Sequence, residues 1–132
     1  MFKTRPVLVV SSNPAQRDQI AELIRRCKLR PVLASSLADA RMILAETHPL
    51  IVFCSDELSD GTLVRAIQTL RAEAGVPVIA LSHLAEWQPY LEACSAGAFD
   101  YIACPPDTKE SRRVLSSALH QFRRDHPRQH AA

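Results

Sequence analysis

Hydrophobic positions in this chain fall into short unbroken runs that are separated by longer amphipathic stretches. The runs are rich in valine, isoleucine and leucine and recur at Pro6–Val10, Pro31–Ala34, Leu50–Cys54, Val76–Leu81 and Asp100–Ala103. Continuous rather than alternating apolarity is typical of strands that are buried on both faces of a sheet. The pattern therefore predicts five buried strands.

A segment with helical periodicity follows each of these runs. The first begins at Asn13, a good N-cap residue, with Pro14 at the first helical position and Gln16 at the capping-box position. The later helices are predicted to begin near Ser36, Thr62, Pro89 and Asp107. In the fourth helix we expect Leu91 and Cys94 to face inward.

Strands that alternate with helices through short connections predict one parallel sheet with helices on both faces, because parallel neighbours need a crossover. The expected fold class is therefore a doubly wound α/β domain formed by residues 1–124. Residues 125–132 have no apolar side chain larger than alanine and contain Pro127, so we expect a disordered basic tail there.

Composition narrows the possible functions. The chain has 132 residues, enough for one domain, and its three glycines lie too far apart for a glycine-rich phosphate or dinucleotide loop. The formal net charge of +2 comes entirely from the last ten residues, which gives no indication of a nucleic-acid partner. The four cysteines form no CxxC pair, and no HExxH motif is present, so the usual zinc motifs are absent.

The apolar runs are also too short for a signal peptide or a membrane span. We therefore expect a cytoplasmic protein with reduced thiols and no membrane partner.

Small polar residues follow the predicted strands, where ligands bind in open α/β sheets. Four segments that contain them resemble the response-regulator receiver (CheY-like) family, in the right order and spacing: Val7–Pro14, His48–Gly61, Val76–Ser82 and Gly97–Pro106. The resemblance implies a flavodoxin-like (βα)5 fold with a five-stranded parallel sheet in the order 2-1-3-4-5. It also implies a role in two-component or phosphorelay signal transduction.

The residues of the family's phosphorylation site are nearly all replaced. Aligned without gaps, Ser11 and Ser12 occupy the positions of the metal-binding acidic pair, Ser55 that of the phosphoacceptor aspartate and Cys104 that of the invariant lysine; Ser82 keeps the hydroxyl of the switch position. Neutral hydroxyls hold Mg²⁺ poorly, and a serine cannot form an acyl phosphate. The chain is thus identified as a pseudo-receiver that binds no Mg²⁺, other metal or cofactor and has no enzymatic activity.

Two alternatives stay open. A local loop shift would present Asp56 as the phosphoacceptor, with Glu57 and Asp60 nearby. The emptied pocket, including Cys104, would instead serve as a small-molecule or redox sensor. Cys54 should point into the core.

Ser82 and Tyr101 occupy the positions of the family's conformational switch. Without a phosphoryl group no ligand energy shifts that equilibrium. We therefore expect Ser82 to bond to neighbouring hydroxyls and Tyr101 to pack between the fourth and fifth strands.

Partner contacts are expected on one side of the domain. Trp87 and Tyr90 lie at the entry to the fourth helix, and Arg112 and Arg113 lie on the last helix. Large aromatic residues on a connection either pack onto the helix or meet a partner. In receivers the face made by the fourth helix, fifth strand and fifth helix is the usual partner surface, so the resemblance implies a signalling protein partner and a possible homodimer there.

Overall fold

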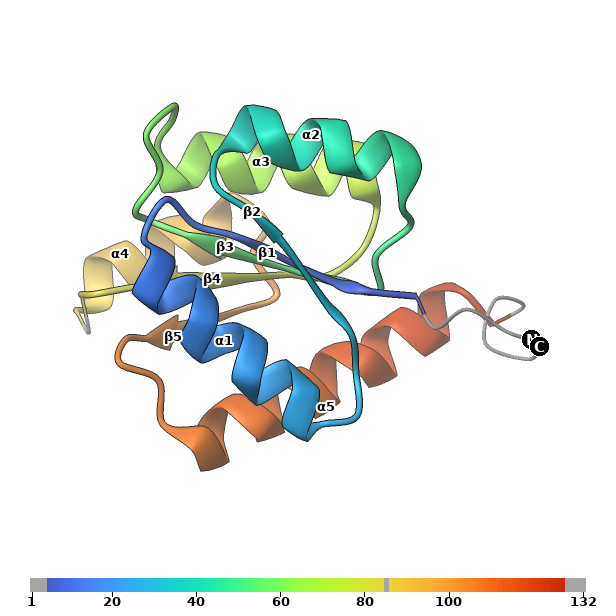
Figure 1. The fold of residues 1–132 in the computed structure, drawn as a ribbon. Coiled ribbons are helices and arrows are strands. Elements are labelled where there is room, and N and C mark those ends of the chain that lie inside the picture. Colours follow the sequence, from blue (N-terminus) through green and yellow to red (C-terminus); the bar gives the residue numbers. More distant parts are fainter. Residues whose placement is uncertain (1–4, 85, 128–132) are drawn as a thin grey trace.

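One five-stranded parallel sheet forms the centre of the molecule (Figure 1). The computed structural model describes residues 5–84 and 86–127. Its strands are β1 (Val7–Val10), β2 (Pro31–Ala34), β3 (Ile51–Ser55), β4 (Val78–Ser82) and β5 (Asp100–Ala103). They pair in the order β2-β1-β3-β4-β5, and every pair is parallel. The predicted fold class and strand order are confirmed.

Helices cover both faces of the sheet. They are α1 (Pro14–Arg26), α2 (Leu37–Glu46), α3 (Leu63–Ala74), α4 (Trp87–Ser95) and α5 (Thr108–Asp125). One core cluster joins strand residues to α1 and α5, and a second joins the alternate strand residues to α2, α3 and α4. Side chains of successive strand residues point to opposite faces, which is why each unbroken apolar run feeds both cores.

Local capping explains where most helices begin and end. Asn13 Oδ1 accepts from the Ala15 and Gln16 amides, and Thr62 caps α3 in the same way. Helix α3 ends at Gly75, whose φ of 65° lies in the left-handed region that favours glycine. These ends were predicted correctly.

The prediction for α4 was partly wrong. The helix begins at Trp87, so Pro89 lies inside the first turn, where backbone amides have no intrahelical partner and proline is tolerated. Ala93 is the fully buried residue of the helix, whereas Leu91 is 44% exposed and Cys94 half-buried. The face centred on Ala93 packs against the sheet, so Leu91, two residues earlier, turns toward solvent.

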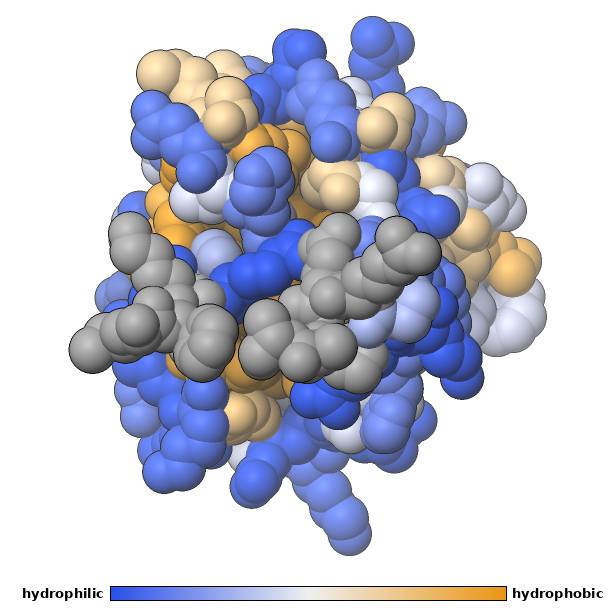
Figure 2. Space-filling view, turned by 90° about the vertical axis from the view of Figure 1, so that its right-hand side faces the viewer, coloured by the Kyte–Doolittle hydropathy of each residue, from blue (hydrophilic) through white to orange (hydrophobic). Residues whose placement is uncertain are grey.

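The two ends of the described chain meet where the strands begin. The Arg5 guanidinium lies 4.7 Å from the centroid of the Phe122 ring, and the His126 ring stacks on Phe122 with centroids 4.3 Å apart. Figure 2 looks at this end of the molecule, where hydrophilic side chains predominate with hydrophobic patches between them. Helix α5 extends to Asp125, and residues 128–132 of the predicted tail lie outside the described residues.

Candidate functional site

The sheet brings the predicted site residues to one edge, at the carboxyl ends of its strands. Ser11 follows β1, Ser55 ends β3, Ser82 ends β4 and Cys104 follows β5. Strand pairing places Val10 beside Cys54 and Ser82 beside Ala103, so these ends are neighbours across the sheet. The site therefore lies where the strand order reverses, between the loops that leave β1 and β3.

Ser55 is completely buried at this edge. Its Oγ accepts a 2.9 Å hydrogen bond from the backbone amide of Glu57, two residues further on. The hydroxyl at the phosphoacceptor position therefore shapes the loop after β3. The neighbouring Cys54 points into the core as predicted, and burial raises the pKa of its thiol to about 12.

A neutral hydrogen-bond chain joins the position of the first acidic residue to that of the lysine. Ser11 Oγ donates to Gln16 Oε1 at 2.7 Å, and Gln16 Nε2 donates to Cys104 Sγ at 3.4 Å. Gln16 is 3% exposed, and burial is the main cause that raises the pKa of the Cys104 thiol. Gln16 thus does not complete a capping box as its position had indicated, because the Asn13 amide donates to Ser11 Oγ instead.

Ser12 connects three loops. Its Oγ donates to the Ser35 carbonyl at 2.7 Å and accepts from the Ser59 amide at 2.9 Å. Its own amide donates to the Glu57 carbonyl at 2.8 Å. Both positions of the expected acidic pair therefore hold hydroxyls that are already engaged by the protein.

Asp56 brings a carboxylate into the site without any loop shift. Its Oδ2 accepts from Ser82 Oγ at 2.8 Å and from the His83 amide at 3.3 Å. Its Oδ1 is buried, makes no well-formed hydrogen bond, and lies 3.4 Å from His83 Nδ1. The expectation that Ser82 bonds to hydroxyls is wrong, because Asp56 lies just beyond the end of β3 and reaches across to the end of β4.

Glu57 and His83 complete the polar groups at the mouth of the site. His83 Nε2 lies 3.2 Å from Glu57 Oε2, and the same oxygen accepts from Asn13 Nδ2 at 2.8 Å. The His83 side chain is 47% exposed. Its place directly after a strand was the sequence signal for this residue, but nothing in the sequence showed that Asp56 and Glu57 would lie on either side of its ring.

Tyr101 is buried, but it does not simply lie between two strands. Its hydroxyl donates to the Leu84 carbonyl, in the loop after β4. Its ring meets Tyr90 edge-on with centroids 5.8 Å apart, and Tyr90 stacks on Trp87 with centroids 5.4 Å apart. The structure thus joins three of the predicted residues into one aromatic row that runs outward from β5.

The outer end of this row is exposed. Among the described residues, the exposed large hydrophobic side chains are Met42, Leu84, Trp87 and Leu91. Three of these four, Leu84, Trp87 and Leu91, lie in or just before α4. Arg112 and Arg113 are exposed on α5, and no hydrogen bond or ion pair is seen between them and the aromatic row.

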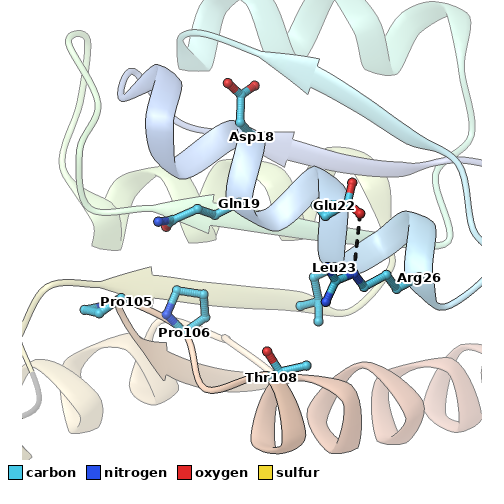
Figure 3. A pocket seen from close by; sticks show the side chains of 8 residues that line it. All are labelled: Asp18, Gln19, Glu22, Leu23, Arg26, Pro105, Pro106 and Thr108. Carbon is cyan, nitrogen blue, oxygen red and sulfur yellow. Dashed lines mark hydrogen bonds and ion pairs between the residues drawn. The ribbon is translucent and has the colours of Figure 1, made fainter.

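An open hollow of about 440 Å³ lies elsewhere, between α1 and the start of α5 (Figure 3). Its lining residues are Asp18, Gln19, Glu22, Leu23, Arg26, Pro105, Pro106 and Thr108. Glu22 and Arg26 form an ion pair across its rim at 3.4 Å. Pro105 and Pro106 belong to the Gly97–Pro106 segment of the sequence analysis, but none of the lining residues was a predicted site residue.

The described residues contain neither a metal-binding cluster nor a membrane-spanning helix. No group of three or more histidine, cysteine or carboxylate residues is arranged to hold a metal ion. In the same part of the chain, every helix is too short or too polar to cross a membrane.

Comparison with curated proteins finds response regulators. Regulatory protein AtoC of Escherichia coli (strain K12) is 31% identical over 114 residues, which are 86% of this chain and 25% of AtoC. Response regulator protein PilR of Pseudomonas aeruginosa is 28% identical over 115 residues, or 85% of this chain and 25% of PilR. The chain therefore spans about a quarter of the length of these relatives. No protein-family model matches it.

Solved structures share the fold. The signal receiver domain of an HD domain-containing protein from Pseudomonas fluorescens Pf-5 superposes with a TM-score of 0.84 at 17% identity. The alignment covers 92% of this chain and 99% of that one. At this identity the likeness shows the fold alone.

Proposed function

The chain belongs to the receiver-domain family of response regulators, and we propose that it is a pseudo-receiver, which signals through protein–protein contacts without being phosphorylated. The observation that carries the proposal is the neutral hydrogen-bonded chain at the centre of the site. Ser11, Gln16 and Cys104 bond to one another where a working site needs a carboxylate and a lysine. The pocket has lost charges of both signs together, which avoids leaving a buried charge without its partner.

In this proposal the serines at the family's metal-binding and phosphoacceptor positions are poor ligands for Mg²⁺. This ion prefers carboxylate ligands in near-octahedral geometry and gives up its water reluctantly. Ser11 and Ser12 offer hydroxyls that are already bonded to Gln16 and the Ser35 carbonyl, and Ser55 is buried. Phosphoryl transfer depends on a cation to neutralise the developing charge, so this arrangement favours a site without that chemistry.

The exposed end of the aromatic row is the partner surface in this proposal. Trp87 offers a large apolar side chain that is 72% exposed, and Leu84, just before α4, and Leu91, one turn further along α4, are exposed as well. Aromatic residues of this kind dominate binding energy when a partner covers them. The partner is a signalling protein or a second copy of the chain, which would meet this surface through α4, β5 and α5, with Arg112 and Arg113 at the rim.

Phosphorylation of Asp56 is the second candidate. It is favoured by the 2.8 Å contact between Asp56 and Ser82, because the switch hydroxyl lies beside the phosphoryl group in working receivers. Against it, His83 covers the free side of the carboxylate. The described residues show no lysine or arginine paired with Asp56 or Glu57.

A redox sensor is less well supported. Sensor thiols need a lowered pKa from nearby cations or a helix N-terminus. Burial raises the pKa of Cys104, and Asp56 and Glu57 add to that shift. The small-molecule alternative stays a prediction for a ligand screen by thermal shift.

The decisive test follows the fluorescence of Trp87, the only tryptophan, while Mg²⁺ and then beryllofluoride are added. The pseudo-receiver should show no saturable change at millimolar Mg²⁺. Intact-mass measurement after incubation with acetyl phosphate should find no adduct. A receiver with its phosphoacceptor aspartate serves as the positive control.

A saturable response would overturn the proposal. If the adduct also disappears in Asp56→Asn but persists in Asp18→Asn, an exposed aspartate on α1, the second candidate is correct. An acid-stable adduct on a serine would contradict both.

A further inference from the structure

His83 spans the mouth of the site between two carboxylates. Its Nδ1 lies 3.4 Å from Asp56 Oδ1 and its Nε2 lies 3.2 Å from Glu57 Oε2. The Asp56 oxygen is buried and has no well-formed hydrogen bond of its own. Both ring nitrogens therefore face oxygen atoms that only accept hydrogen bonds.

The two protonation states of the ring fit this arrangement differently. A neutral imidazole has one N–H and one nitrogen lone pair, so it donates to one carboxylate and presents its lone pair to the other. The imidazolium form donates from both nitrogens and adds an attractive charge. Histidine ordinarily changes charge between about pH 5 and 8. The complete bridge thus forms in the protonated state.

The charged and titratable groups around the ring are few. Asp56 and Glu57 come from the loop after β3, and Asn13 from the loop after β1 contributes a neutral amide. Cys104, from the loop after β5, lies beyond the two carboxylates and its raised pKa keeps it neutral. On its own loop, the nearest charged residue in the chain is Glu86.

Hydrogen bonds connect the loop that carries His83 to Asp56 and to the aromatic row. The His83 amide and Ser82 Oγ both donate to Asp56 Oδ2, and the Leu84 amide donates to Ser82 Oγ. The Leu84 carbonyl in turn accepts from Tyr101, which packs against Tyr90 and so against Trp87. The loop after β4 is thereby held at one end by the carboxylates and at the other by the aromatic row.

We propose that His83 is a proton-operated latch: its protonated ring ties the loop after β4 to Asp56 and Glu57, and its deprotonation releases that loop and changes how Trp87 is presented. The latch is closed at acidic pH and open at alkaline pH. Its role in signalling depends on the proposed function, namely that a partner docks on the Trp87 surface. The latch itself is a property of the isolated chain.

The test is a ¹⁵N NMR titration from pH 5.5 to 8.5, with the histidine ring protons followed in parallel. The His83 ring, the Leu84 amide and the Trp87 indole N–H should shift with one common midpoint. In His83→Gln the shifts of Leu84 and Trp87 should be lost. In His120→Gln, which removes an exposed histidine on α5, they should persist.

The latch would be overturned if the pH-dependent shifts of Leu84 and Trp87 persisted in His83→Gln. It would also be overturned if the His83 ring titrated while the Leu84 amide and the Trp87 indole N–H did not shift. Glu57→Gln provides a second variant should His83→Gln not fold: it removes the charge that Nε2 of the ring faces, so it should reduce the pH-dependent shifts of Leu84 and Trp87. Undiminished shifts in Glu57→Gln would contradict the bridge. These measurements need no partner or phosphodonor. They can therefore refute the latch whether or not the proposed function is correct.

Discussion

Ser82 donates a 2.8 Å hydrogen bond from its Oγ to Asp56 Oδ2, so the hydroxyl at the switch position is already committed to a carboxylate. The same Oγ accepts from the Leu84 amide. The Ser82 hydroxyl thus bonds both to the partly buried Asp56 carboxylate and to the backbone amide of Leu84 in the loop after β4. Its contribution can be measured.

Ser82→Ala should lower the free energy of unfolding by about 1–3 kcal/mol, because it removes the shorter hydrogen bond to Asp56 Oδ2 and leaves the Leu84 amide without this acceptor. Urea denaturation measures the change. Ser117→Ala, at an exposed position of α5, should stay within about 0.5 kcal/mol of the parent chain. Equal effects of the two variants would mean that the Asp56 contact contributes nothing.

Restoring the lost charges should restore ligand binding. The triple variant Ser12→Asp, Ser55→Asp, Cys104→Lys should bind beryllofluoride in a Mg²⁺-dependent manner, measured by fluorescence of the single tryptophan. The double variant that lacks Cys104→Lys should be less stable than the triple one by about 3 kcal/mol, because a carboxylate at the fully buried position 55 then has no cation. A folded triple variant that binds nothing would show that the loop geometry, too, has departed from a working site.

The hydrogen bonds that Asp60 accepts should make part of the free energy of unfolding depend on pH. Its carboxylate accepts from the Ala38 amide at 2.9 Å and the Leu37 amide at 2.8 Å, at the start of α2. These bonds, that from Ala38 first, lower the pKa of Asp60. The stabilisation is therefore complete above the unfolded pKa, ordinarily about 3.9, and is lost as pH falls through the lower folded pKa.

Asp60→Ala should thus cost about 1 kcal/mol at pH 7, the usual size for a lost helix cap, and much less at pH 2. Denaturant titrations at the two pH values measure this difference. Asp18→Asn provides the control, since Asp18 is exposed in the middle of α1. A cost that is the same at both pH values would contradict the capping role.

Cys104 should react slowly with iodoacetamide at pH 7, because its raised pKa leaves little thiolate. Mass spectrometry of the alkylated peptides should show the rate rising as pH increases. Hydrogen peroxide should produce no Cys104-dependent dimer. A dimer that forms with the parent chain and Cys94→Ala but is lost in Cys104→Ala would instead support the redox sensor.

Trp87→Ala should weaken partner binding or self-association at least tenfold while leaving stability nearly unchanged. Met42→Ala is a matched control, because Met42 on α2 is also 72% exposed and large, as Trp87 is. Sedimentation over a concentration series tests the homodimer, and co-purification from cells tests other partners. If Met42→Ala has the same effect, the interface is not on α4.

The sequence was most informative where the structure of a residue depends on its neighbours along the chain. Short unbroken apolar runs are typical of strands between two helical layers, and Thr62 and Gly75 placed the ends of α3 correctly. The position of Ser55 was also predictable, because the motif around it fixes the register on both sides. Such inferences depend on neighbours along the chain.

The errors arose where residues distant in sequence decide the outcome. Gln16 has the right position for a capping box, but its side-chain amide instead accepts from Ser11 Oγ and donates to Sγ of Cys104, 88 residues away. The approach of Asp56 to Ser82 was not predicted, because Asp56 lies one residue beyond the end of β3, where the strand pleat no longer dictates the direction of its side chain. The ring of His83 meets carboxylates from another loop, a contact that no local pattern encodes.

Arg5 and His126 both pack against the ring of Phe122, and this arrangement has a topological consequence. Because residues near the two ends of the domain pack on one ring, a short linker can join them and the chain can be cut elsewhere. The exposed turn at Gly75, between α3 and β4, is a suitable new opening. Such a circular permutant would keep every loop of the site intact and would bring the new termini to the same end of the sheet as the old ones.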